Sequence, residues 1–291
     1  MTAVATMPST APSTTVSTTD CNAPIGLFDS GVGGLSVYQH LQKKLPNERF
    51  IYYADTANVP YGAKSASEII NLSHQAVSWL IACGCKLIIV ACNSASAFAL
   101  PSLRAAFDIP IVGLVPAVKP AVQLSHTHKI AVLATHATLT GQLFLGVVQE
   151  IATPAGTEVL SHFEPRLVPW VESGMPITHE VADLLISQMH AWYQDGVDVL
   201  VLGCTHYPFF KDFLQQEINK SGIKMTLIDS GQAIAERVHS LLNIANMLAT
   251  TPNTLGLQLH ATANTEQTHA IASALIGQIT HPINNHSIHT H

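Results

Sequence analysis

The chain has 291 residues, of which 47% are hydrophobic and only 11% are charged, and its formal net charge at pH 7 is -6. This length predicts one large or two modest domains, with two favoured, and the apolar fraction excludes a largely disordered protein. An acidic chain lacks the basic face that nucleic-acid-binding proteins need, so we expect no nucleic-acid partner.

The chain is predicted to be cytoplasmic. Its most apolar stretch, residues 79–91, is interrupted by Gly84 and Lys86 and is too short for a membrane span, so no membrane contact is expected. The first Lys or Arg is Lys43, so no charged start of a signal peptide precedes it. Five cysteines are an odd number in a long, core-forming chain, which disfavours a disulfide scaffold and favours a reducing compartment.

The expected elements begin after a disordered leader, because residues 1–22 are rich in Thr and Ser and show no periodicity. Short apolar runs predict strands at residues 25–28, 50–54, 87–91, 111–114, 130–134, 157–161, 199–202, 226–228 and 257–260. Helices are predicted at residues 34–45, 65–83, 94–107, 141–151, 177–194 and 232–248. Strands that alternate with helices of this length are typical of an α/β fold whose mainly parallel sheets are covered on both faces.

A weak internal repeat predicts two related lobes. Residues 87–93 (LIIVACN) resemble residues 199–205 (VLVLGCT), and residues 25–31 (IGLFDSG) resemble residues 130–136 (IAVLATH). The two offsets are nearly equal, which favours duplication over chance. We expect the lobes to face each other with the carboxyl ends of their strands, where open α/β sheets bind ligands.

The first candidate ligand loop is residues 29–34 (DSGVGG), between a predicted strand and a predicted helix. Its glycines are expected to allow positive φ and to let backbone N–H groups converge on an anion at the helix start. A dinucleotide site is disfavoured, because Ser36 stands where the fingerprint needs Gly or Ala, and Asp29 would repel a pyrophosphate. A small carboxylate or amino acid fits better, since Asp29 can accept from an ammonium group or assist proton transfer.

The second candidate loop is residues 55–62 (DTANVPYG), which taken alone predicts a tight turn punctuated by Pro60 and Gly62. It becomes a candidate ligand loop because it follows a strand at the same edge of the same sheet.

Two cysteines are the strongest feature of the sequence. Cys92 and Cys204 each close an apolar strand, whereas Cys83 and Cys85 lie at a predicted helix end and turn and are interpreted as structural. A thiol at a helix N-terminus has a lowered pKa, so two such thiols across one substrate can act as base and acid. That arrangement suits inversion at a carbon with an acidic proton. A disulfide or redox pair is the competing use, but neither cysteine belongs to a Cys-x-x-Cys motif.

His206 lies two residues after Cys204 and can orient or help to deprotonate that thiol. A metal site is disfavoured, because no second pair of ligands follows at zinc spacing. The His-rich tail, residues 280–291, is predicted to be disordered and receives no catalytic role.

These segments together resemble the glutamate racemases of the cofactor-independent aspartate/glutamate racemase superfamily. The matching segments span most of residues 24–231 and are 26–34 (GLFDSGVGG), 55–62 (DTANVPYG), 91–94 (ACNS), 134–138 (ATHAT), 167–172 (LVPWVE) and 203–208 (GCTHYP). The resemblance implies that Cys92 deprotonates D-glutamate and Cys204 deprotonates L-glutamate, with no cofactor. It offers Asp29, Glu172 and His206 as helpers of the two thiols.

The resemblance also implies the substrate contacts and the division of the chain. The implied contacts are Asp29, Ser30, Pro60, Tyr61, Gly62, Asn93, Ser94, Thr135, Thr138, Thr205 and His206. Ser94 departs from the family's usual Thr; the hydroxyl is kept, and we expect the contact to survive with looser packing. Residues 23–116 with 226–279 are expected to form one lobe, and residues 117–225 the other. The implied role is supply of D-glutamate for peptidoglycan, and a homodimer is left open.

Two alternatives stay open from the sequence. One is a sister racemase that acts on aspartate or a related small acid, which would differ only in its contacts to the side-chain carboxylate. The other is a non-catalytic binding protein for an anionic metabolite, with the same loops and inert thiols.

Overall fold

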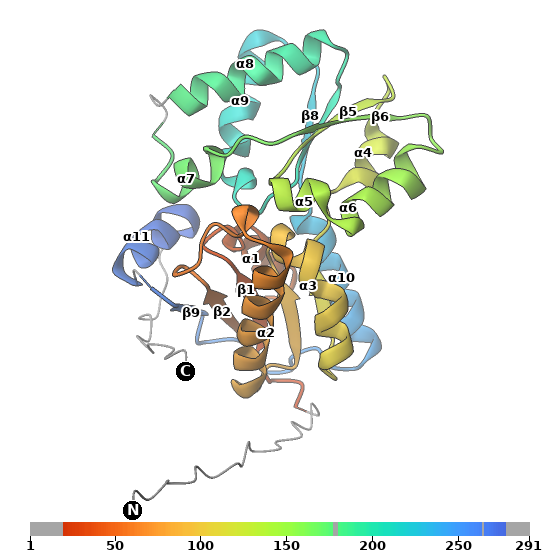
Figure 1. The fold of residues 1–291 in the computed structure, drawn as a ribbon. Coiled ribbons are helices and arrows are strands. Elements are labelled where there is room, and N and C mark those ends of the chain that lie inside the picture. The colour runs from red at the N-terminus through yellow and green to blue at the C-terminus, as the bar shows by residue number, and fades with distance from the viewer. Residues whose placement is uncertain (1–19, 177–179, 264, 278–291) are drawn as a thin grey trace, which may run out of the picture.

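Two parallel β-sheets organise the computed structural model, which describes residues 20–176, 180–263 and 265–277 (Figure 1). The first sheet has five strands in the order β4-β3-β1-β2-β9, and the second has four in the order β6-β5-β7-β8. All of these strand pairs are parallel. The strands are β1 (Ile25–Asp29), β2 (Phe50–Ala54), β3 (Leu87–Val90), β4 (Ile111–Gly113), β5 (Lys129–Leu133), β6 (Glu158–His162), β7 (Val199–Leu202), β8 (Thr226–Ile228) and β9 (Leu257–Ala261).

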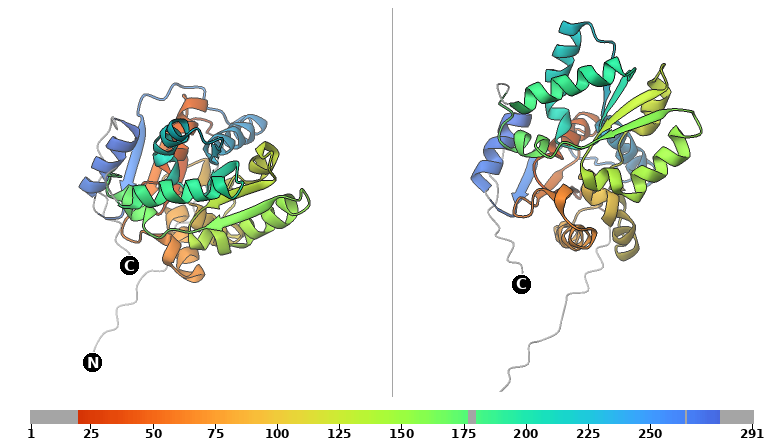
Figure 2. Two further views of the ribbon diagram at one scale, coloured as in Figure 1. Left: turned by 90° about the horizontal axis from the view of Figure 1, so that it is seen from above. Right: turned by 45° about the horizontal axis from the view of Figure 1, so that its top comes forward.

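Helices cover both faces of each sheet, as Figure 2 shows from two further directions. In the first lobe they are α1 (Leu35–Lys44), α2 (Ala66–Ala82), α3 (Asn93–Ala106), α10 (Gly231–Ile244) and α11 (Thr265–Ile276). In the second lobe they are α4 (Val118–Leu124), α5 (His136–Thr140), α6 (Gln142–Val147), α7 (Leu167–Glu172), α8 (Glu180–Gln194) and α9 (Lys211–Ser221). Short 3₁₀ turns follow at η1 (Tyr61–Ala63) and η3 (Tyr207–Phe210), and a π-helical turn, η2 (Val148–Ala152), continues α6.

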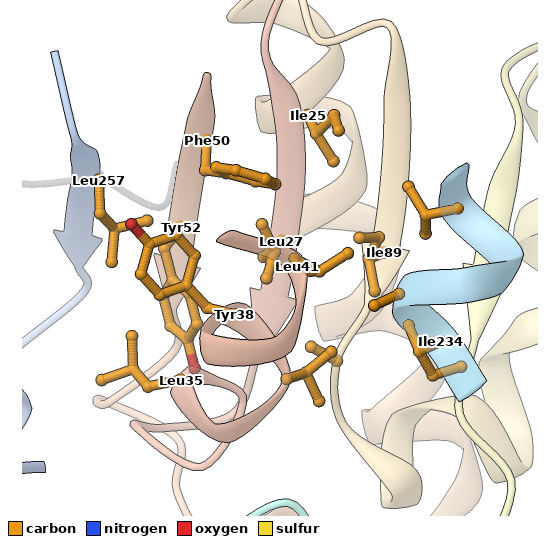
Figure 3. Packing of buried hydrophobic residues seen from close by; sticks show 14 of the residues in the cluster. Ile25, Leu27, Leu35, Tyr38, Leu41, Phe50, Tyr52, Ile89, Ile234 and Leu257 are labelled. Atoms are coloured by element: carbon orange, nitrogen blue, oxygen red, sulfur yellow. The ribbon is translucent and has the colours of Figure 1, made fainter. Parts of the chain in front are cut away.

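The α/β fold and the two related lobes that the sequence predicts are confirmed. Each predicted strand is present, and β4-β3-β1-β2 of the first sheet corresponds in order to β8-β7-β5-β6 of the second. The inner strands β1, β2, β3, β5 and β7 are mostly apolar because both faces of a parallel sheet are buried, whereas the edge strands β6 and β9 carry polar residues. Figure 3 shows one such face, where Leu27 and Phe50 of the strands lie beside Leu41 and Tyr38 of α1, and Ile89 of β3 lies beside Ile234 of α10.

The predicted helices differ from the observed ones mainly at their ends. Predicted helix 232–248 ends at Ile244, and predicted helix 141–151 is divided between α6 and the π-helical turn η2. The start predicted for helix 177–194 lies partly outside the described residues, as do residues 1–19 of the predicted leader and the tail beyond residue 277. No helix within the described ranges combines the length and apolar character needed to cross a bilayer.

The chain crosses between the lobes twice, after β4 and after β8. Ser230 donates a hydrogen bond of 2.7 Å from its hydroxyl to the carbonyl of Val115, and this bond ties the two crossing segments together. The boundary expected before Thr226 is wrong, because β8 pairs with β7 in the second sheet. A short apolar run shows that a strand is present but not which sheet it joins. The return crossing therefore comes after Ile228.

A buried ion pair holds the opposite end of the first lobe, away from the cleft. Lys86 Nζ lies 2.6 Å from Glu48 Oε2, and the two side chains are 0% and 2% exposed. Lys86 also donates to the carbonyls of Cys21 and Met247, and Glu48 accepts from the backbone N–H of Ala249. The pair therefore joins four segments that are distant in sequence.

We expect Lys86→Met to lower the free energy of unfolding by about 3–5 kcal/mol, because it leaves the Glu48 carboxylate buried and unpaired. The double variant Glu48→Leu/Lys86→Met should recover part of that loss. Urea unfolding followed by circular dichroism measures both. The matched control is Lys44→Met, which removes the more exposed pair with Glu236 and should change stability by less than about 1 kcal/mol. Equal effects of Lys86→Met and Lys44→Met would contradict this account.

Candidate active site

A cavity of about 220 Å³ lies between the lobes at the carboxyl ends of their strands. Parallel strands all end at one edge of their sheet, so the loops after several strands meet there. The first lobe contributes the loops after β1, β2 and β3, and the second contributes those after β5, β6 and β7. The lining residues are Ser30, Pro60, Tyr61, Gly62, Ala63, Cys92, Asn93, Ser94, Thr135, Phe163, Glu164, Pro165, Val168, Cys204, Thr205 and His206.

Cys92 is the thiol of the first lobe and the N-cap residue of α3. Its sulfur accepts from the backbone N–H of Ala95 at 3.4 Å and lies 3.7 Å from the hydroxyl oxygen of Ser30. The side chain is almost fully buried, and burial raises the pKa of the Cys92 thiol to about 12, with the nearby charge of Asp29 adding to the rise. The lowered pKa expected from the helix N-terminus is therefore wrong for Cys92. Burial outweighs the helix, and Cys92 is held as the neutral thiol.

Cys204 is the thiol of the second lobe, and it faces a histidine instead of a carboxylate. Its sulfur lies 3.8 Å from Nδ1 of His206, whose Nε2 lies 2.7 Å from Glu172 Oε1. Burial by itself lowers the pKa of His206, but contacts with Cys204 and Glu172 raise that pKa well above its usual value. Burial raises the pKa of Glu172, yet contact with His206 brings it below its usual value. The second thiol therefore borders an imidazolium–carboxylate pair.

Asp29 connects the two sides of the site. Its Oδ1 accepts from the backbone N–H of Gly31 at 2.7 Å, and its Oδ2 accepts from the hydroxyl of Thr205 at 3.0 Å. Burial raises the pKa of the Asp29 carboxyl to about 6, against the lowering influence of His206 and of the two hydrogen bonds. Asp29 is therefore a carboxyl group poised to change protonation near neutral pH.

The glycines of the loop after β1 have a different role from the predicted one. Gly31, Gly33 and Gly34 are not among the described glycines with positive φ, so the expectation of left-handed backbone in this loop is wrong. The backbone N–H of Val32 does donate to an anion, but that anion is Glu172 Oε1 of the second lobe, at 3.3 Å. The loop thus binds a carboxylate of the protein itself.

Three hydroxyl groups form a chain across the cleft. Ser94 Oγ lies 2.9 Å from Thr135 Oγ1, which lies 2.8 Å from Thr138 Oγ1. Ser94 comes from the first lobe, and both threonines come from the second. Hydroxyls of this kind can all turn to donate to a carboxylate oxygen.

Tyr61, in the loop after β2, is fixed by a buried carboxylate. Its hydroxyl donates to Asp55 Oδ2 at 2.5 Å, and Asp55 also accepts from Asn58 and from Thr262 at the end of β9. Burial, followed by the charge of Asp55, raises the pKa of Tyr61 far above its usual value. The wall formed by Pro60, Tyr61 and Gly62 is thus anchored to the edge strand of its sheet.

Most of the residues predicted from the sequence line this cavity. Asp29, Glu172 and Thr138 do not line it but contact residues that do, namely Thr205, His206 and Thr135. The sequence interpretation missed Ala63, Phe163, Glu164, Pro165 and Val168. Phe163 and Glu164 directly follow β6, so the rule that residues after a strand face the cleft identifies them.

The arrangement provides an acid and a base from two directions. A neutral thiol from one lobe and a sulfur beside an imidazolium from the other border one cavity, where protons can be transferred to and from a bound carbon acid. Across the described ranges, no group of three or more His, Cys, Asp or Glu side chains is arranged to hold a metal ion.

Comparisons with known proteins agree with this geometry. A family model described as Asp/Glu/Hydantoin racemase matches residues 25–238. The glutamate racemase of Deinococcus radiodurans is 46% identical over 225 residues, which are 77% of this chain and 77% of that protein.

Two solved structures share the fold. The glutamate racemase of Francisella tularensis in complex with D-glutamate matches with a TM-score of 0.76 and 29% identity, over 90% of this chain and 97% of that one. The Escherichia coli glutamate racemase in complex with L-glutamate and the activator UDP-MurNAc-ala matches with a TM-score of 0.74 and 31% identity, over 88% and 96%. Because the family model covers well over half of the sequence, the chain belongs to the Asp/Glu/Hydantoin racemase family of isomerases.

Proposed function

We propose that the chain interconverts L-glutamate and D-glutamate by a two-base mechanism in which Cys92 and Cys204 are the bases. The observation that carries the proposal is the pair of thiols, one from each lobe, that border a single cavity. Relatives named glutamate racemase, at up to 46% identity, support glutamate as the substrate.

The proposed reaction transfers two protons. In the direction from L to D, the Cys204 thiolate takes the Cα proton and leaves a carbanion at Cα. The Cys92 thiol then donates its proton to the opposite face of Cα, which yields D-glutamate, a Cys204 thiol and a Cys92 thiolate. The reverse direction starts from that second state. Each group changes charge once, so atoms and charges balance without a further reactant.

The neighbours of the thiols support this division of roles. When Cys204 is the thiolate, His206 carries a proton on Nδ1 as an imidazolium, and Glu172 orients the ring and stabilises its positive charge. On the other side, Asp29 can hold the substrate ammonium group near Cys92. That positive charge offsets the burial that otherwise keeps Cys92 neutral.

The polar lining suits an amino acid with two carboxylates. The hydroxyls of Ser94 and Thr135 line the cavity and can donate to the side-chain carboxylate, while Thr138 hydrogen-bonds to Thr135 behind them. Asn93 is buried and its side-chain N–H₂ group has no hydrogen-bond partner, so this group can donate to the other carboxylate of the substrate. The remaining proposed contacts are Ser30, Pro60, Tyr61, Gly62, Thr205 and His206. An aspartate racemase would need these donors closer to Cα, and a panel of acidic amino acids distinguishes the two.

We further propose that no cofactor takes part, since the two thiols supply both the acid and the base. D-Glutamate made in this way would serve peptidoglycan synthesis in the cytoplasm and hence cell-wall biogenesis and cell shape. This assignment follows from the racemase family and from the substrate, not from residue geometry. A homodimer remains an expectation of the same kind.

The first test follows the optical activity of L-glutamate incubated with the purified chain. After dialysis against a chelator and with no added cofactor, the circular dichroism signal should decay to zero, and D-glutamate should behave in the same way. Activity that is lost with the chelator and restored by a metal ion would rule out the two-thiol mechanism. If the chain binds glutamate selectively but does not convert it, the alternative of an anion-binding protein is favoured.

The second test replaces each thiol. Cys92→Ser and Cys204→Ser should each lower racemisation by about 10²–10⁴-fold, the contribution of one general acid or base. In deuterated water the wild-type product should carry deuterium at Cα while the remaining substrate gains little at early times. Cys83→Ser serves as the matched control and should keep full activity. Near wild-type rates in both single variants would show that Cys92 and Cys204 are structural.

The third test uses the pKa of Asp29, raised from 3.8 to about 6. A carboxyl whose pKa is raised on folding contributes stability below pH 4 that is lost as the pH rises through 6. Asp29→Asn removes this dependence, so relative to wild type it should gain up to about 3 kcal/mol between pH 4 and pH 7.5. The rate of racemisation by Asp29→Asn should nevertheless fall. Urea unfolding of both proteins at pH 4 and pH 7.5 measures the change in stability. If the difference in stability between Asp29→Asn and wild type is the same at both pH values, the raised pKa of Asp29 is refuted.

A further inference from the structure

Two glycines of the loop after β1 face the catalytic groups of the opposite lobe at very short range. A Cβ atom placed on Gly33 would lie 2.4 Å from Nδ1 of His206 and 2.6 Å from Oγ1 of Thr205. A Cβ on Gly31 would lie 2.4 Å from Oε1 of Glu172. Such distances are well inside van der Waals contact, so neither site has room for a side chain while the lobes are together.

Backbone conformation does not explain these glycines. Neither Gly31 nor Gly33 has positive φ, so alanine fits the backbone at both positions without strain. The neighbouring Gly34 is different, because a Cβ there would meet Tyr52 Oη at 2.8 Å and Ala91 Cβ at 3.0 Å, both in its own lobe. Among the glycines of this loop, it is Gly31 and Gly33 at which the second lobe leaves no room for a side chain.

The loop and the helix that follows it also bind the second lobe through hydrogen bonds. In the loop, Val32 donates its N–H to Glu172 Oε1 at 3.3 Å, and in the first turn of α1, Ser36 donates its hydroxyl to the carbonyl of Thr205 at 2.8 Å. The backbone of the two glycines and these two donors together contact Thr205, His206 and Glu172 of the second lobe. We name residues 31–33 the docking loop.

We propose that the docking loop is a positioning element that sets how far the lobes close and thereby fixes His206 against Cys204. Gly33 is its main contact, because its neighbours are a rigid imidazole ring and a threonine already bonded to Asp29. Gly31 is the weaker contact, because its neighbour is the end of a flexible glutamate side chain. The proposal deepens the proposed function and rests on it only for the effect on turnover.

The test compares Gly33→Ala, Gly31→Ala and a control, Gly146→Ala. Gly146 lies in α6, lacks positive φ, and a Cβ there would meet no atom within 4 Å. Turnover should fall on the order of 10²-fold in Gly33→Ala, since a misplacement near 1 Å has that effect, and less in Gly31→Ala. Gly146→Ala should match wild type.

A second measurement reports lobe closure without any racemase assay. Cys92 and Cys204 are only 4% and 6% exposed, so their alkylation by iodoacetamide should be slow in wild type. It should be fastest in Gly33→Ala, intermediate in Gly31→Ala and unchanged in Gly146→Ala, while far-UV circular dichroism stays the same. Hydrogen exchange at the Val32 amide should rise in the same order.

The outcomes separate the two proposals. Wild-type alkylation and turnover in Gly33→Ala would overturn the docking loop, as would loss of the folded state in that variant, since the proposal requires the first lobe to tolerate alanine. If wild type does not racemise glutamate but the alkylation order holds, the docking loop stands and the proposed function fails. If Gly31→Ala affects alkylation as strongly as Gly33→Ala, the assignment of Gly33 as the main contact is wrong.

Discussion

The hydrogen bond from the hydroxyl of Thr205 to Asp29 Oδ2 joins the two lobes at the centre of the cleft, and the rest of the site depends on it. Asp29 is the last residue of β1 and Thr205 follows β7, so each is held by the central part of its own sheet. Both groups are buried, and an unpaired acceptor in that position would cost about 1–3 kcal/mol. The lobes are therefore joined at this point by groups of the protein itself, beside the cavity that both thiols line.

The two thiols occupy corresponding places in the lobes but have opposite electrostatic surroundings. Cys92 has the Asp29 carboxyl nearby, whereas Cys204 has the His206 imidazolium, itself paired with Glu172. A nearby negative charge favours the protonated form of a thiol, so Asp29 adds to the burial that holds Cys92 as the neutral thiol. The two sulfurs therefore have different neighbours before any substrate binds.

Local patterns in the sequence predicted the strands and the position of both cysteines at strand ends, whereas most of the polar lining came from the resemblance to the racemases. The local predictions succeed because an apolar run and the residue that follows it can be identified from a short stretch of sequence. The carboxyl ends of parallel strands then lie at the same edge of the sheet. What failed depends on packing between distant segments of the chain. The sheet that β8 joins, the burial that reverses the expected pKa shift of Cys92, and the close approach that requires Gly33 are all set by residues far away in sequence. Phe163 and Glu164 were missed for a different reason, since they follow a strand but belong to no motif.

The shared order of β4-β3-β1-β2 and β8-β7-β5-β6 bears on a problem of chirality. The two substrates of a racemase are mirror images, but a chain of L-residues has no mirror symmetry and cannot present reflected surfaces to them. Rotation is available to it. Two lobes with the same strand order can place the same chemical group after equivalent strands, as Cys92 follows β3 and Cys204 follows β7, on opposite faces of one tetrahedral carbon. For the proposed reaction, the repeated fold thus places one thiol on each face of Cα by a rotation. The protein therefore treats the two mirror-image substrates alike without being mirror-symmetric itself.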